Sequence, residues 1–149
     1  MSNTQNLMKK AEGYVQWRRI TLVINALAYV GWIGSTGLGF LPGVAIDPAL
    51  LRLVSAISWP IWLLSLLGIF AQMAYARKHR DIAALADDER TVGYTKTAFQ
   101  TGYWLLLIGL ALVYAASYFT QLDVKAVIPF MLALGVAAPS LTYAMLDRG

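Results

Sequence analysis

Cysteine is absent from this 149-residue chain, which excludes disulfides, cysteine-ligated metals, iron–sulfur clusters and thiol nucleophiles. Histidine occurs only once, as His79, so two histidines of one chain cannot ligate a haem. Charged residues are also scarce, at 13% of the chain, whereas about a quarter is typical of a soluble domain. The composition therefore argues against a soluble domain of this size.

Long apolar runs take the place of the missing charges, and 58% of the residues are hydrophobic. A helix needs about 20 apolar residues to cross a bilayer. Four runs meet this length, at residues 20–42, 50–75, 99–120 and 126–146, and Arg52 is the only charged residue inside them. The sequence therefore predicts an all-α integral membrane protein, a bundle of four transmembrane helices in one membrane domain.

The basic residues predict how this domain is oriented. Ten of the twelve Lys and Arg residues lie before the first run, after the last run or in the 76–98 connection. Positively charged loops remain on the cytoplasmic side of a membrane. We therefore expect both ends of the chain and the 76–98 connection in the cytoplasm, with short outer loops, in the inner membrane of a bacterium.

Two segments carry patterns that predict helix packing. Residues 1–19 hold an apolar face made by Leu7, Ala11, Tyr14 and Val15, which favours a short interfacial helix on the inner leaflet. In the first run, small residues recur at every fourth position, where they let another helix approach closely. This stripe could pack within the bundle or form the seam of a homodimer; its members are Gly31, Ser35 and Gly39.

Polar side chains near the cytoplasmic ends of the runs could form one hydrogen-bonded layer across all four helices. Its members would be Asn25, Gln72, Gln100, Thr142 and Tyr143. Such residues usually join helices, but a polar binding site at the inner mouth is the alternative. Three tryptophans lie deeper and could line a pocket for a flat lipophilic ligand or simply pack: Trp32, Trp59 and Trp62.

The usual groups for chemistry are missing from the runs. No acidic residue lies deep in any run, although proton-coupled transporters and pumps usually use a carboxylate within the membrane. No Ser/His/Asp set with plausible geometry is present, and no glycine-rich phosphate loop follows a strand. We therefore expect a non-enzymatic protein with no cofactor and no metal, and no direct binding of nucleic acid.

The 76–98 connection concentrates the remaining charge, and two interpretations of it stay open. Asp87 or Asp88 suits the N-cap of a helix that begins near residue 88, with Arg77, Lys78 or Arg80 as salt-bridge partners. Alternatively, the connection is a docking surface for a soluble protein, with Leu85, Val92 and Tyr94 as apolar anchors. The residues of this docking surface would be Asp87, Asp88, Glu89, Arg90 and Tyr94.

The segment from Asp88-Glu89-Arg90-Thr91 through Ala98 to Gly102-Tyr103-Trp104 resembles a group of small bacterial and archaeal membrane proteins. These carry an acid-acid-Arg signature just before a transmembrane helix and are often encoded beside small helix-turn-helix regulators. The resemblance implies that the protein holds or releases such a regulator at the membrane, and it extends only over residues 87–104.

Two functions are therefore expected from the sequence. The first is the binding or sequestration of a soluble cytoplasmic protein through the 76–98 connection. The alternative is a small dimeric channel or transporter, or a membrane protein that binds a lipophilic ligand.

Overall fold

The fold was analysed in a computed structural model, which describes residues 3–41, 43, 45–87 and 89–147. The side chains of residues 3, 4, 89 and 90 lie outside the description. Over the described residues the chain forms five α-helices and no strand, which confirms the all-α prediction. The helices are α1 (Asn3–Leu38), α2 (Pro48–Lys78), α3 (Arg80–Ala86), α4 (Glu89–Ser117) and α5 (Val124–Leu146).

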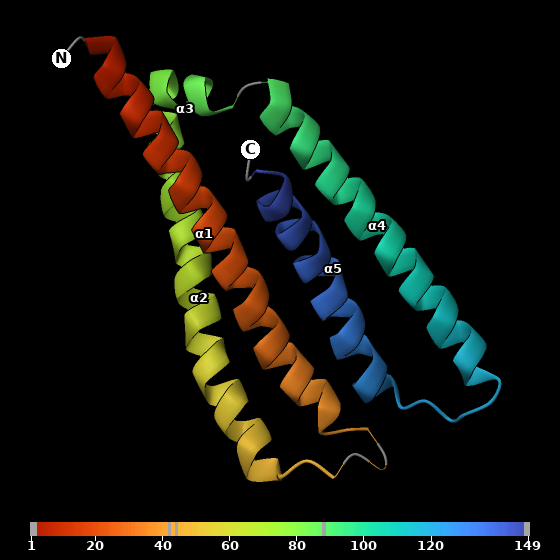
Figure 1. Cartoon of the computed structure of the whole chain (residues 1–149). Coiled ribbons are helices and arrows are strands. Elements are labelled where there is room, and N and C mark those ends of the chain that lie inside the picture. Colours follow the sequence, from red (N-terminus) through yellow and green to blue (C-terminus); the bar gives the residue numbers. More distant parts are fainter. Residues whose placement is uncertain (1–2, 42, 44, 88, 148–149) are drawn as a thin grey trace.

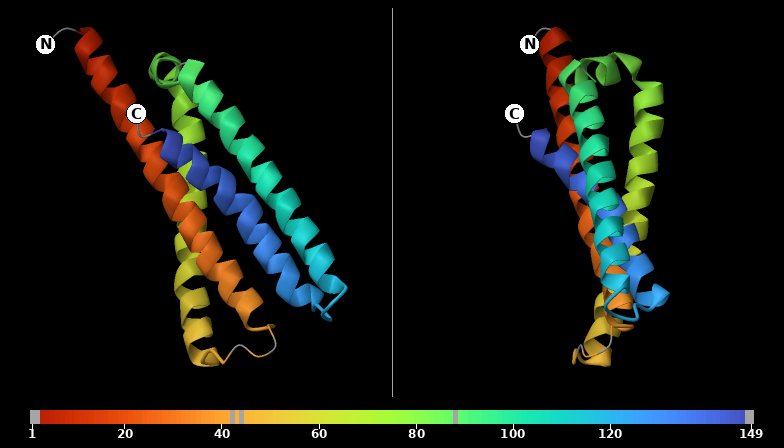
Figure 2. Two further views of the ribbon diagram at one scale, coloured as in Figure 1. Left: turned by 45° about the vertical axis from the view of Figure 1, so that its right-hand side comes forward. Right: turned by 90° about the vertical axis from the view of Figure 1, so that its right-hand side faces the viewer.

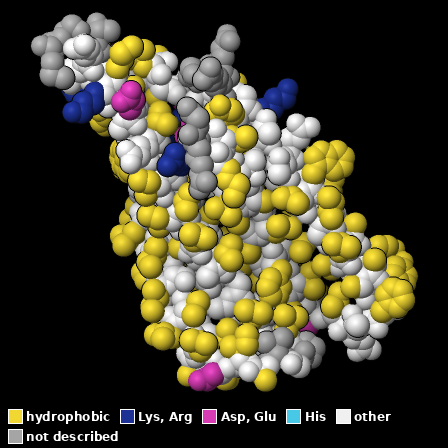
Figure 3. All heavy atoms as spheres, viewed as in Figure 1, with side chains coloured by type: hydrophobic (Ala, Val, Ile, Leu, Met, Phe, Trp, Pro, Cys, Tyr) yellow, Lys and Arg dark blue, Asp and Glu magenta, His cyan; other side chains and the backbone are white. Residues whose placement is uncertain are grey.

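Four of the helices, α1, α2, α4 and α5, are long and apolar enough to cross a membrane. Large apolar side chains cover their outer surfaces, and Leu64, Phe99 and Leu112 are each exposed by 66% or more. Figure 3 shows this apolar surface across the middle of the molecule, with Lys and Arg near one end. A soluble monomer rarely exposes so much continuous apolar surface, so the surface suits contact with lipid.

The start of α2 follows directly from its sequence. Pro48 is the first residue of the helix, and the Asp47 carboxylate accepts a hydrogen bond of 2.8 Å from the Ala49 backbone N–H. Proline suits the first helical turn because it has no N–H to leave unpaired, and aspartate is a favoured N-cap. The chain can therefore reverse direction within the short loop that follows α1.

The long helices pack in the order α2, α1, α5, α4 (Figures 1 and 2). α1 packs along α2 on one side and along α5 on the other, while α4 packs along α5. Over the described residues, α2 makes no extensive contact with α4 or α5. The start of α1, the end of α5 and α3 all lie at one end of the molecule (Figure 1), called here the α3 end.

Small residues allow the helices to approach one another. A Cβ atom added to Gly31 would clash with Ser58 of α2, and one added to Gly37 would lie 3.1 Å from Phe130 and Pro129 of α5. Ser35 is buried, whereas Gly39 is exposed. Gly31, the first residue of the predicted stripe of Gly31, Ser35 and Gly39, therefore packs against α2 of the same chain. Packing within the bundle is one of the two uses expected for this stripe.

The N-terminal segment differs from the expected interfacial helix. Residues 5–19 continue into the first span without a break, as part of the 36-residue helix α1. Ala11 and Tyr14 are buried against Ile82 and Ala86 of α3, so this apolar face packs on protein. The physical reason is that α3 folds back across α1 and offers its own apolar side chains to the same face. At 1.5 Å per residue α1 is about 54 Å long, which exceeds the hydrocarbon core of about 30 Å.

Candidate functional site

An ion pair holds the connection against α1. Arg18 Nη1 lies 2.6 Å from Asp87 Oδ1, and the two side chains are 17% and 50% exposed. Asp87 was expected to cap the next helix or to pair with Arg77, Lys78 or Arg80. It instead ends α3, with its backbone N–H donating to the Ala83 carbonyl. The path of α3 across α1 brings Asp87 to an arginine 69 residues away. Asp88, the other predicted cap, lies outside the described residues.

Arg18 is held by aromatic rings as well as by Asp87. Its guanidinium carbon lies 5.8 Å from the ring centre of Tyr14 and 5.3 Å from that of Tyr143, within the range of a cation–π contact. Burial lowers the pKa of Arg18, but the hydrogen bond to Asp87 and the electrostatic effects of Tyr143, Asp87 and Asp147 together raise it more, so the net pKa lies above its ordinary value. Arg18 therefore remains a fixed positive charge that joins α1, α5 and the connection.

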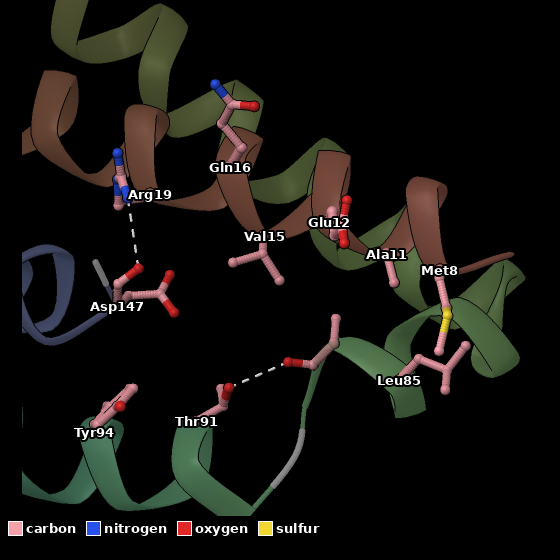
Figure 4. Close-up of a pocket in the computed structure, with 11 residues that line it drawn as sticks. Met8, Ala11, Glu12, Val15, Gln16, Arg19, Leu85, Thr91, Tyr94 and Asp147 are labelled. Carbon is pink, nitrogen blue, oxygen red and sulfur yellow. Dashed lines mark hydrogen bonds between the residues drawn. The ribbon is translucent and has the colours of Figure 1, made fainter. Parts of the chain in front are cut away.

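A cavity of about 630 Å³ opens beside this ion pair at the α3 end (Figure 4). We call it the α3 cleft, because it lies where the N-terminal part of α1 meets the end of α3 and the start of α4. Its volume falls within the range of about 300–1,000 Å³ that is usual for ligand pockets. Its lining residues are Met8, Ala11, Glu12, Val15, Gln16, Arg19, Leu85, Ala86, Thr91, Tyr94 and Asp147.

The α3 cleft has an apolar end and a polar end (Figure 4). Met8 and Leu85 lie together at the apolar end and are 56% and 53% exposed. At the polar end, Arg19 Nη1 donates to the backbone carbonyl of Asp147 over 3.5 Å, while Thr91 Oγ1 donates to the Ala86 carbonyl over 3.1 Å. An apolar side chain flanked by polar groups would fit such a cavity.

The predicted docking surface overlaps the α3 cleft only in part. Tyr94 lines the cleft, while Asp87 is half exposed and bonded to Arg18. Asp88 and the side chains of Glu89 and Arg90 lie outside the described residues. Of the predicted apolar anchors, Leu85 and Tyr94 line the cleft; Val92 does not, and is 65% exposed.

Sequence reasoning missed the contribution of α1 to the α3 cleft. That contribution consists of Met8, Ala11, Glu12, Val15, Gln16 and Arg19. The apolar periodicity of residues 7–15 was the available signal, but it was assigned to lipid. α3 follows α2 after a single residue and α2 packs along α1, so the apolar face at the start of α1 lies within reach of α3.

Two of the five side chains expected to form one layer, Asn25 and Gln72, make separate side-chain hydrogen bonds between α1 and α2. Gln72 Nε2 donates to Thr21 Oγ1 over 2.8 Å, and Asn25 Nδ2 donates to Ser65 Oγ over 3.0 Å. Gln100 is exposed on α4. A layer across four helices does not form among these residues, because α2 lies at one side of the row and does not pack on α4 or α5.

The two remaining members of the expected layer are neighbours on α5. Tyr143 is buried beside Arg18, and Thr142 is half-buried. Both therefore belong to α5, which packs on α1 apart from α2.

The deeper tryptophans pack against one another. Trp32 of α1 and Trp62 of α2 have ring centres 5.0 Å apart, and Tyr29 lies 5.7 Å from Trp62. Trp59 is instead 47% exposed. Trp32 and Trp62 thus contribute to the α1–α2 interface, which is the packing role left open by the sequence.

Comparison with protein-family models, with curated proteins and with solved structures finds no match to this chain.

Proposed function

We propose that this is a non-enzymatic membrane protein that binds a soluble cytoplasmic protein in the α3 cleft. The observation that carries the proposal is the exposure of Met8 and Leu85 inside one cavity of about 630 Å³. The end of the molecule that bears this cavity also bears Lys9, Lys10, Arg77 and Lys78, and basic flanks remain cytoplasmic.

The charges around the α3 cleft favour a partner segment with both apolar and basic side chains. Glu12 is exposed in the lining, and the structure gives it no ion pair within the described residues. An amphipathic helix that packs an apolar side chain against Met8 and Leu85 could place a basic residue near Glu12. Recognition of this kind uses anchors spaced along one helix face.

The class of partner follows from the sequence resemblance described above, which implies a small helix-turn-helix regulator. Such a regulator would be kept from its DNA while it occupies the α3 cleft.

The test is affinity capture of the soluble partner by the tagged protein from detergent-solubilised native membranes. Leu85→Glu places a charge at the apolar end of the α3 cleft, and Leu85→Met keeps that end apolar. Val92→Glu is the matched control, because Val92 is also more than half exposed but lies outside the cleft. Exposed positions such as these usually change stability by no more than about 0.5 kcal/mol, so the variants should fold.

We expect a soluble protein that is retained by the wild type, by Leu85→Met and by Val92→Glu, and is lost from Leu85→Glu. Loss from both glutamate variants would indicate a general effect of charge. Equal retention by Leu85→Glu and the wild type would refute docking in the α3 cleft.

A further inference from the structure

A second cavity lies between α1, α4 and α5. Arg18 lines this cavity, whereas its neighbour Arg19 lines the α3 cleft. The volume of the second cavity is about 410 Å³, again within the range of about 300–1,000 Å³ usual for ligand sites. Most of its lining is apolar and includes Leu22, Phe99, Val136 and Pro139. Arg18 and Tyr143 line it as well. We call this cavity the Arg18 groove.

Arg18, which lines the groove, has two donor nitrogens that none of the described residues uses. Asp87 takes a hydrogen bond from Nη1, whereas Nε and Nη2 are buried and have no hydrogen-bond partner in the part of the chain that the structure describes. These two nitrogens form one edge of the planar guanidinium, and their N–H groups point the same way. That edge matches two oxygens of a single carboxylate or phosphate group.

Tyr143 adds a third unused group beside Arg18. The residue is only 7% exposed, and its hydroxyl has no hydrogen-bond partner among the described residues. Two other hydroxyls line the groove, but each donates to its own helix: Thr95 to the Thr91 carbonyl over 2.9 Å, and Ser140 to the Val136 carbonyl over 2.8 Å. Buried donors without partners are costly, so the arrangement favours an acceptor supplied by a ligand.

We propose that the Arg18 groove binds an anionic lipid of the surrounding bilayer. The acidic head group accepts hydrogen bonds from Arg18 Nε and Nη2 and from the Tyr143 hydroxyl, and an acyl chain lies along Leu22, Phe99 and Val136. Asp87 does not block the head group, because it occupies the other end of the guanidinium.

The position of the groove supports a lipid as the occupant. Arg18 lies two residues before the first predicted run, where lipid head groups would be expected, and Phe99 is 68% exposed on the apolar surface of α4. Basic pockets between transmembrane helices on the cytoplasmic side are known to bind acidic head groups. This site requires no protein partner and is independent of the function proposed for the α3 cleft.

The test measures lipid binding to the purified protein in a neutral detergent by native mass spectrometry. Dioleoyl phosphatidylglycerol is the anionic probe and dioleoyl phosphatidylcholine the zwitterionic one. We expect one tightly held phosphatidylglycerol, bound about tenfold more tightly than phosphatidylcholine. Tyr143→Phe keeps the ring on Arg18 and removes the hydroxyl, and it should weaken phosphatidylglycerol binding about tenfold, the loss expected for one hydrogen bond to a charged group.

Two further variants make the result specific. Tyr103→Phe, at an exposed tyrosine of α4, should bind phosphatidylglycerol like the wild type. Arg18→Lys keeps the charge and the pairing with Asp87 but lacks the two-donor edge. It should also bind at least tenfold more weakly, and it decides the question if Tyr143→Phe does not fold.

Equal binding of the two lipids, or unchanged binding by folded Arg18→Lys, would overturn the proposal. The last measurement uses inorganic phosphate as a competitor of phosphatidylglycerol. If it displaces phosphatidylglycerol at equal concentration, the site belongs to a soluble anion and the lipid assignment is wrong.

Discussion

Gly102 is the position where one added methyl group should do most damage to the contact between α4 and α5. A Cβ atom at Gly102 would lie 2.8 Å from Pro139 Cδ, about 0.6 Å closer than the 3.4 Å at which ordinary contact begins. The proline ring cannot rotate away, so the two helices would have to separate. Overpacking of this kind typically costs about 1–3 kcal/mol.

The same helix provides controls for Gly102→Ala. A Cβ at Gly93 meets nothing within 4 Å, and one at Gly109 meets the flexible end of Leu134 at 3.0 Å. Replacing a helical glycine by alanine gains up to about 1 kcal/mol, which should make Gly93→Ala more stable than the wild type. Gly102→Ala should be about 2 kcal/mol less stable than Gly93→Ala, with Gly109→Ala between the two.

The assay is reversible unfolding by sodium dodecyl sulfate in mixed micelles, followed by far-UV circular dichroism. The order Gly93→Ala, Gly109→Ala, Gly102→Ala, from most to least stable, supports the packing. If Gly102→Ala is as stable as Gly93→Ala, α4 does not approach Pro139 as described and the reasoning fails.

Two further predictions concern the polar contacts of α1. In the same assay, the double-mutant cycle of Thr21→Val with Gln72→Leu should show a coupling energy of about 0.6 kcal/mol. The effects of Asn25→Leu and Gln72→Leu should instead be additive, because the two hydrogen bonds share no partner. Strong coupling between Asn25 and Gln72 would support the single polar layer. Asp87→Asn should cost less than about 1 kcal/mol of global stability, as is usual for a pair with an exposed member, but it should speed amide hydrogen exchange in α3. High salt should act in the same direction on the wild type, and unchanged exchange in α3 would show that Arg18 does not hold the connection.

Local patterns predicted the individual helices well. The apolar runs placed the four candidate spans, because the length needed to cross a bilayer is a property of each segment alone. The start of the helix expected near residue 88 lies at Glu89, and the Asp47–Pro48 pair begins α2. Capping and proline geometry act within one helical turn, so they can be recognised without knowledge of the rest of the chain.

The residues brought together at the α3 end were harder to predict, since their arrangement depends on contacts between distant segments. Asp87 pairs with Arg18 because α3 crosses α1, and nothing in the local charge pattern distinguishes Arg18 from the nearer Arg77 and Arg80. Met8 likewise faces Leu85 only after this crossing (Figure 4).

The packing order of the long helices also could not be predicted from the sequence. Within a membrane, the face of a helix that meets lipid is as apolar as the face that meets another helix. Hydrophobic periodicity therefore identifies a span but does not say which side of it packs. In the sequence, Gly31 indicates that another helix approaches closely at this position. Only the tertiary structure shows that this neighbour is Ser58 of α2. Patterns in the sequence thus determined which segments are long and apolar enough to cross a membrane, and contacts between segments decided the order α2, α1, α5, α4 and the shapes of the α3 cleft and the Arg18 groove.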